Sequence, residues 1–261
     1  MEILLGFGIA LMISLTGVGA GSMTTPLLIL LLGVNPATAV GTALTFGAIV
    51  KIASVPVYAF RNQVNFRILR LLLAGGLPGV LLGSLLLGWL KNSSYSGSLY
   101  VALGSIIISI SLFHLWRVFF PQRNAEHKDR PNLLWACALP IGAEVGFSSA
   151  GAGALGSLLL LSFTRLTPAE VVGTDLCFGL GLSAVGSVIQ LGQGNFDSAL
   201  LYKLVIGGLC GAITGSFLAG RIAQRPLRVG LLTMLVVLGF QLATHSKPAP
   251  APRAMLQAYR R

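Results

Sequence analysis

Long blocks of apolar residues limit what this chain can fold into more than any other feature of its sequence. Each of six blocks is long enough to cross a lipid bilayer as a helix, which takes about 20 residues. Only 10% of the 261 residues are charged, whereas a soluble domain carries about 25%. The sequence therefore predicts an all-α, polytopic integral membrane protein surrounded by the lipid bilayer. The blocks lie at residues 36–60, 67–90, 97–120, 167–192, 199–222 and 228–245.

The net charge of +11 does not indicate a nucleic-acid partner. The Arg and Lys residues stand between the apolar blocks and in the C-terminal tail, where the positive-inside bias places them. No soluble module carries a basic face with interleaved aromatic residues. We expect no metal and no cofactor, because Cys137, Cys177 and Cys210 lie far apart in apolar segments and form no ligand pattern.

The sequence repeats itself after a shift of about 132 residues, which indicates an internally duplicated fold. The stretch NPATAVGTALTFG at 35–47 lies over TPAEVVGTDLCFG at 167–179. Glycines at four-residue spacing also coincide, and these are typical of close helix packing. We expect residues 1–120 to form a first transmembrane repeat, 121–131 a hydrophilic connector, 132–246 a second repeat and 247–261 a flexible basic tail.

Each half begins with an apolar segment that small residues interrupt, GVGAGS at 17–22 and SSAGAG at 148–153. If the broken segment enters and leaves the bilayer on one side, each half crosses three times and the halves are inverted. If it forms one broken crossing, each half crosses four times and the halves are parallel. The inverted arrangement gathers most loop Arg and Lys residues on one face, so the positive-inside bias favours inverted repeats.

Two helix breaks at equivalent positions are the strongest indication of a binding site. Broken backbone inside a bilayer survives only where protein or a water-filled cavity covers it, and repeated transporters bind their substrates at such breaks. A half-helix that starts after the break directs its N–H groups at the solute, which favours an anion. Glycine used only for helix packing is the structural alternative. The substrate-binding residues expected here are Gly19, Gly21, Ser22, Thr24, Thr25, Ser148, Ser149, Gly151 and Gly153.

A second repeated element is a Gly-Thr pair near the start of each long helix. It comprises Gly41 and Thr42 in the first half and Gly173 and Thr174 in the second. We count all four as candidate substrate-binding residues because they recur. The structural alternative is that each threonine bonds to the backbone of its own helix.

Three ionisable residues fall inside apolar segments, where a charge is costly and is by default suspected of function. Lys51 stands about fifteen residues beyond Pro36, near the middle of the bilayer at the helical rise of 1.5 Å per residue. It could offset the charge of a bound anion, and a snorkelling lysine is the structural alternative. Asp175 and Glu144 are candidate proton carriers for coupling, and neither has an acidic counterpart in the other half.

The glycine-rich breaks together with NPATAVGTALTFGAIVKI, SSAGAGALG and TPAEVVGTDL resemble the TauE/SafE family of sulfite exporters over roughly residues 5–245. The resemblance implies secondary transport of sulfite, sulfoacetate or related sulfur-containing or organic anions across the bacterial inner membrane. The two half-sites are chemically unequal, because Ser22 matches Ala154 and Lys51 matches Ser183. The resemblance implies site-forming roles for Gly19, Gly21, Pro36, Gly41 and Thr42, and for Gly151, Gly153, Pro168, Gly173 and Thr174.

We therefore expect a secondary transporter, not an enzyme, that exports a small anion across the inner membrane with proton coupling, as a monomer or a homo-oligomer. One alternative is uptake of thiosulfate or another sulfur species, with Cys177 touching the solute. Another is an intramembrane serine hydrolase that uses Ser148 or Ser149 with His114, although this does not explain why the glycine break occurs twice. The chain has no GxxxxGK[ST] motif, so ATP hydrolysis by this chain is not expected.

Overall fold

The structure is a computed structural model that describes residues 2–16, 20–92, 96–119, 133–150, 152–218 and 224–244. Within these ranges the chain forms ten α-helices and no strand, which confirms the all-α prediction. The expected connector, 121–131, and tail, 247–261, lie outside the described residues. The helices are α1 (Glu2–Thr16), α2 (Ala20–Leu32), α3 (Pro36–Phe60), α4 (Phe66–Asn92), α5 (Ser96–Phe119), α6 (Leu134–Ser148), α7 (Ala152–Phe163), α8 (Pro168–Gly192), α9 (Ser198–Leu218) and α10 (Gln224–Thr244).

Five of these helices are long and apolar enough to cross a bilayer. They match five of the six expected blocks, and the sixth block coincides with the shorter apolar part of α10, Val229–Thr244. Helices α1, α2 and α6 are also apolar but shorter than a full crossing. The long apolar segments are Pro36–Phe60, Phe66–Lys91, Leu99–Trp116, Pro168–Gly192 and Ser198–Gly215.

The five helices α1–α5 and the five helices α6–α10 follow the repeat of the sequence. Helices α3 and α8 have 25 residues each, and each begins with a proline behind a capping side chain. Asn35 Oδ1 accepts a backbone N–H two residues further on at 3.1 Å, and Thr167 forms the expected capping box with Glu170. Just beyond each helix lies a residue with positive φ, Asn62 at 53° and Gly194 at 70°, which turns the chain toward the next helix.

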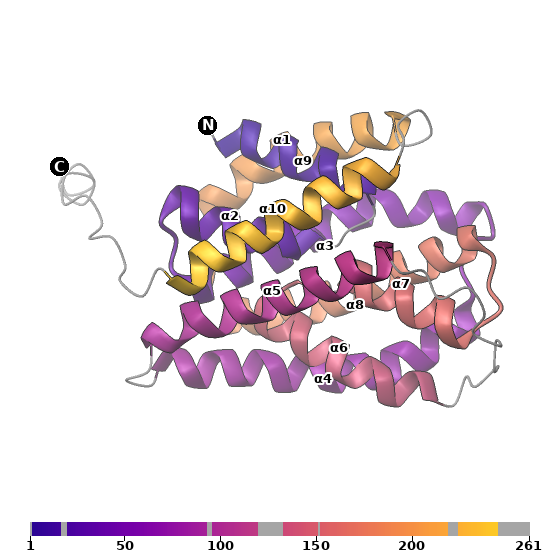
Figure 1. The fold of residues 1–261 in the computed structure, drawn as a ribbon, viewed down its shortest axis with the longest axis horizontal. Coiled ribbons are helices and arrows are strands. Elements are labelled where there is room, and N and C mark those ends of the chain that lie inside the picture. Colours follow the sequence, from indigo (N-terminus) through magenta and orange to yellow (C-terminus); the bar gives the residue numbers. More distant parts are fainter. Residues whose placement is uncertain are drawn as a thin grey trace.

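The two halves interleave in space. Helices α3 and α8 lie in the middle of the molecule, with the α1–α9 pair along one side and the α4–α6 pair along the other (Figure 1). Helices α5 and α10 pack on each other as a further pair. Each of these four pairs joins one helix of the first half to one helix of the second, so much of the packing of each half is against the other half.

Glycines in α4 and α9 allow the α4–α6 and α1–α9 pairs to approach backbone to backbone. A Cβ added at Gly79 would overlap the carbonyl oxygen of Leu139 in α6, so a side chain does not fit there. The contacting residues advance together along both helices, so the partners in each pair run parallel. This is the small-residue packing that helices use in membranes. The contacts join Gly75 with Trp135, Gly79 with Leu139 and Gly83 with Ala143 in the α4–α6 pair, and Gly207 with Ile3 and Gly211 with Phe7 in the α1–α9 pair.

Contacts in register also give the directions of the remaining central helices. Helix α3 is antiparallel to α8, α8 is parallel to α4, and α9 is parallel to α3. Helices α1, α3 and α9 therefore run one way, while α4, α6 and α8 run the opposite way. Because α1 and α3 have the same direction, α2 between them carries the chain back, and α7 does the same between α6 and α8. The contacts join Leu44 with Gly186 and Lys51 with Gly179, Leu73 with Gly181 and Val80 with Gly186, and Thr42 with Asp197 and Phe46 with Gly208.

We predict that Gly79→Ala destabilises the protein, because the new methyl group must push α4 away from α6. Overpacking of this kind costs about 1–3 kcal/mol. The measurement is the thermal unfolding midpoint of the purified protein in detergent, which should fall clearly below that of the unmodified chain.

Gly230→Ala is the matched control, because a Cβ at Gly230 meets no other atom within 4 Å. This second substitution should leave the midpoint unchanged or raise it, since alanine favours helix over glycine. Equal midpoints for both variants would contradict the proposed role of the glycine contact.

Candidate functional site

The first turns of α2 lie against the end of α6. Helix α6 ends at Ser148, and Ser149 takes a left-handed conformation with φ of 60° that turns the chain out of the helix. Gly21, at the start of α2, lies against Ser149 so closely that an added Cβ would overlap the Ser149 carbonyl oxygen. The Thr25 and Ser149 hydroxyl oxygens are 2.6 Å apart, and Thr25 Oγ1 donates to the Ser148 carbonyl oxygen at 3.3 Å. We call these four residues, Gly21, Thr25, Ser148 and Ser149, the tip contact.

The carboxyl group of Glu144 is hydrogen-bonded to this tip contact. Ser148 Oγ donates to Glu144 Oε1 at 2.6 Å and accepts the Ala150 N–H at 3.2 Å. Glu144 Oε2 is shielded from solvent and has no hydrogen-bond partner in the described part of the chain. Ser148 therefore joins the Glu144 carboxyl group directly to the end of α6.

Lys51 lies buried between the two central helices, with 6% of its surface exposed. Its Nζ donates to the Gly179 carbonyl oxygen at 3.1 Å and to Ser183 Oγ at 3.0 Å, both in α8. Lys51 and Ser183 are 132 residues apart and occupy equivalent positions in the two halves. A buried cation thus stands where the halves face each other. Sequence reasoning did not count Ser183 as a site residue, although its place opposite Lys51 in the repeat was a usable signal.

Asp175 is a second buried charge on α8, with 5% of its surface exposed. Its Oδ2 accepts from Ser157 of α7 at 2.6 Å, while Oδ1 packs on Gly156 and has no hydrogen-bond partner among the described residues. Gly179, which accepts from Lys51, follows Asp175 by one helical turn, so the two oppositely charged groups occupy neighbouring turns of α8. Sequence reasoning missed Ser157, which is the counterpart of Thr25 in the repeat.

The Gly-Thr pair of the first half holds a loop of the second half. A Cβ at Gly41 would overlap the carbonyl oxygen of Asn195, and Thr42 Oγ1 accepts the Asp197 N–H at 3.4 Å. Both partners lie in the loop between α8 and α9. We call this contact the first clasp.

The Gly-Thr pair of the second half does the same to the first half. A Cβ at Gly173 would overlap the carbonyl oxygen of Gln63, and Thr174 Oγ1 accepts the Asn65 N–H at 3.0 Å. Both partners lie in the loop between α3 and α4, and we call this contact the second clasp. The four Gly-Thr residues therefore contact the backbone of the opposite half, and Thr42 precedes Lys51 by nine residues, or about 13 Å of helix.

The remaining predicted residues divide into two groups. Ser22 and Thr24 are buried on α2, beside the tip contact. Gly153 lies in the first turn of α7 and is partly buried. Gly19 and Gly151 lie outside the described residues.

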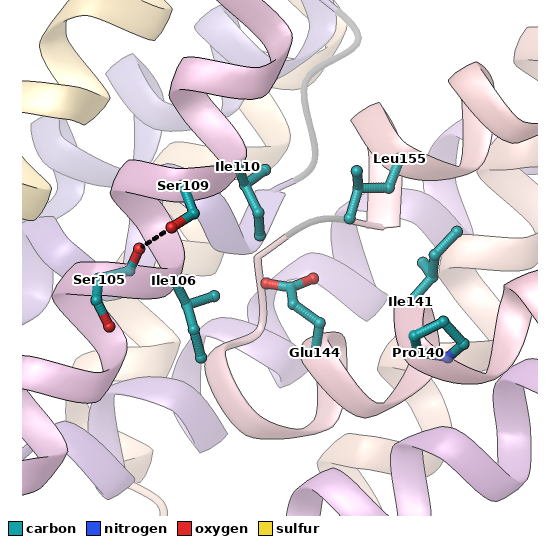
Figure 2. Close-up of a pocket in the computed structure, with 8 residues that line it drawn as sticks. All are labelled: Ser105, Ile106, Ser109, Ile110, Pro140, Ile141, Glu144 and Leu155. Carbon is teal, nitrogen blue, oxygen red and sulfur yellow. Dashed lines mark hydrogen bonds between the residues drawn. The ribbon is translucent and has the colours of Figure 1, made fainter.

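A cavity of about 430 Å³ lies between α5, α6 and α7 (Figure 2). Glu144 is the ionisable residue in its lining and extends from α6 toward α5. Among the predicted site residues, Glu144 alone belongs to this lining. The lining residues are Ser105, Ile106, Ser109, Ile110, Pro140, Ile141, Glu144 and Leu155.

The serine hydroxyls at the second break bond to a carboxyl group and to a threonine, not to the histidine that the hydrolase alternative requires. Ser148 bonds to Glu144, and Ser149 bonds to Thr25. A nucleophilic serine needs a general base at hydrogen-bond distance, usually an imidazole. The His114 Nδ1 contacts the carbonyl oxygen of Ile110 on its own helix.

Several curated proteins are similar to this chain over nearly its whole length. It is 28% identical over 257 residues to the probable membrane transporter protein YjnA of Bacillus subtilis, covering 92% of this chain and 98% of that protein. It is 27% identical over 246 residues to a probable membrane transporter protein of Xylella fastidiosa, covering 90% and 88%. The probable membrane transporter protein YdhB of Bacillus subtilis is 25% identical over 245 residues, covering 92% and 98%. No solved structure matches this chain.

The family match covers almost the entire described structure. Residues 2–242 match the family described as sulfite exporter TauE/SafE. Together with the apolar helices and the named relatives, this match identifies a multi-pass membrane transporter and not an enzyme. The chain belongs to the TauE/SafE family.

Proposed function

We propose that the protein exports sulfite, or a related sulfur-containing or organic anion, across the cytoplasmic (inner) membrane by proton-coupled secondary transport. The observation that carries this proposal is the buried ammonium group of Lys51 between α3 and α8. A charged side chain inside a membrane bundle is costly and marks an ion or substrate path by default. An ammonium group has three donors, and Gly179 and Ser183 accept two of them, which leaves one for an anion oxygen.

The tip contact supplies the rest of the proposed site. Hydroxyl groups of Ser22, Thr24, Thr25, Ser148 and Ser149 cluster where α2 begins and α6 ends. Half-helices α2 and α7 start at the two breaks, so their N-terminal ends favour negative charge there. In this proposal the clasps hold the halves together, and the anion lies between the tip contact and Lys51.

The helix directions support inverted halves. Helices α1 and α2 together behave as a hairpin that enters and leaves the bilayer on one side, and three crossings, α3, α4 and α5, follow. Helices α6 to α10 repeat this pattern with every direction reversed. Alternating access then follows from one half rocking against the other around the site.

Asp175 and Glu144 are the two candidate carriers of the coupled proton. If Asp175 carries the proton, its ionised form lies one helical turn from the Gly179 carbonyl group that Lys51 contacts, and a solute anion must compete with it for Lys51. Its protonation then removes that competitor and leaves Lys51 for the anion. Glu144 is a second carboxyl group that can take part in coupling, through Ser148.

Radiolabelled sulfite should enter proteoliposomes at a rate that depends on an imposed pH gradient. Protein-free liposomes at the same pH values are the control, because neutral sulfur dioxide crosses bare lipid. Flux equal to that control, from folded protein, would refute sulfite as the substrate. Competition by unlabelled sulfonates and carboxylates then defines which anions the site accepts.

Gly21→Ala should reduce sulfite flux about tenfold or more, because an overpacking cost of about 1–3 kcal/mol falls directly on the tip contact. Gly8→Ala, in the neighbouring helix α1, is the matched control, since a Cβ at Gly8 meets no atom within 4 Å. Both variants are compared at equal amounts of protein that elutes as a single species from gel filtration. Equal flux in both would remove the tip contact from the proposed site.

Lys51→Met should raise the sulfite concentration for half-maximal flux about tenfold or more, since a hydrogen bond to a charged group contributes about 1.5–3 kcal/mol. Lys51→Arg should retain part of the affinity, because it keeps the charge. Lys203→Met is the control, because Lys203 forms an exposed ion pair with Glu2 and such pairs contribute little. If Lys51→Met left the affinity unchanged, Lys51 would be structural.

A further inference from the structure

The cavity between α5, α6 and α7 has an acidic group at its inner wall. We call this cavity the Glu144 groove. Its lining is mostly apolar, with Ile106, Ile110, Pro140, Ile141 and Leu155 beside Ser105 and Ser109, as Figure 2 shows. An ionised carboxylate without a counter-charge is costly in such surroundings, whereas the protonated acid is tolerated. The groove therefore suits a group that gains and loses a proton.

The ionisable groups of the helices packed around α6 lie outside the lining of the Glu144 groove. Helices α2 and α7 carry none, and α4 carries charges only near its two ends, at Arg67, Arg70 and Lys91. On α8, Asp175 bonds to Ser157 of α7. On α5, the groove is lined by residues between 105 and 110. The nearest ionisable residues on either side of this lining are Tyr100 and His114. Glu144 Oε1 bonds to Ser148, and Oε2 has no partner in the described part of the chain.

Only the second half carries this carboxyl group. The repeat places Met12 of α1 opposite Glu144 of α6, and Gly8 opposite Pro140. A feature needed for folding of each half would be expected in both copies. Because a methionine holds the same position in the first half, the fold itself does not require an acid there.

Ser148 connects the groove to the tip contact. Its Oγ donates to Glu144 and accepts the Ala150 N–H, and its carbonyl oxygen accepts from the Thr25 hydroxyl. A change at Glu144 thus reaches α2 through one residue. We propose that Glu144 is the proton-binding site of the transporter, separate from the anion site at Lys51, and that its charge state controls the strength of the tip contact through Ser148. This inference rests on the proposed function.

The proton step is simple and balanced. A hydronium ion in the groove transfers H⁺ to the Glu144 carboxylate, an O–H bond forms, and water remains. Ser148 then donates to a neutral acid instead of an anion, and its bond loses roughly half of its strength. The weakened bond frees the turn at Ser149, so that α2 and α6 can separate. Release of the proton on the other side restores the charged bond and closes the tip contact.

Dicyclohexylcarbodiimide tests proton binding directly, because it adds to protonated carboxyl groups in apolar places and leaves a stable N-acylurea. Mass spectrometry of the treated protein should find the adduct on Glu144, with a yield that falls as the pH is raised. Glu170→Gln should not change this yield, since Glu170 is an exposed helix cap. No adduct on Glu144 at any pH would overturn the inference.

Hydrogen exchange at the Ala150 amide tests the link to the tip contact, because this amide bonds to Ser148 Oγ. At about pH 8, where an ordinary carboxyl group is ionised, Glu144→Gln should speed its exchange about fivefold, since the charge-assisted bond is lost. The Asn65 amide in the second clasp reports overall folding and should exchange at the same rate in both proteins. Unchanged exchange at Ala150 would overturn the inference.

Flux measurements separate the two carboxyl groups. Sulfite flux through Glu144→Gln should lose its dependence on the pH gradient, while Glu170→Gln keeps the dependence of the unmodified chain. Loss of the dependence in Asp175→Asn together with its retention in Glu144→Gln would place the proton site at Asp175 and overturn the inference. Absence of sulfite flux in the unmodified protein would refute the proposed function, and carbodiimide labelling and Ala150 exchange would still decide the role of Glu144.

Discussion

Close contact between helix backbones is the constraint on which this fold depends. Lipid chains are as apolar as leucine, so membrane helices gain little from hiding apolar side chains against each other. They associate instead through dense packing, and glycine provides the closest approach. Here the backbone of α6 packs on the glycines of α4, and the backbone of α1 packs on the glycines of α9. These short helices are thereby fixed across the boundary between the halves.

Equivalent positions of the two repeats carry different side chains at the candidate site. Thr25 and Ser157 are counterparts, yet one bonds to Ser149 at the tip contact and the other to Asp175. Lys51 faces its own counterpart, Ser183. The repeated helices therefore bring residues of both halves together. The buried cation, Lys51, comes from the first half, and the two carboxyl groups, Asp175 and Glu144, come from the second. In the proposed function this inequality separates the anion site from the proton site within one structure.

Much of the local structure could be predicted from the sequence. Proline behind Asn35 or Thr167 marks the starts of α3 and α8 because capping is a matter of a few neighbouring residues. The partners of the Gly-Thr pairs could not be predicted, since Thr42 and Asp197 are 155 residues apart and threonine has many uses in a helix. Ser157 and Ser183 were missed because serine is common in membrane helices, and their positions opposite Thr25 and Lys51 in the repeat do not by themselves show that they contact Asp175 and Lys51.

The two clasps also have a consequence for the origin of the protein. Each Gly-Thr pair finds its loop in the opposite half, so a single half would lack partners for both the pair and the loop. A second, identical copy would supply them, because in a twofold dimer residue i contacts j and j contacts i. An ancestral chain of half this length could therefore have assembled as a homodimer with the same clasps. In such a dimer Lys51 and Glu144 would each occur in both halves, so their presence on one side only requires that both halves belong to one chain.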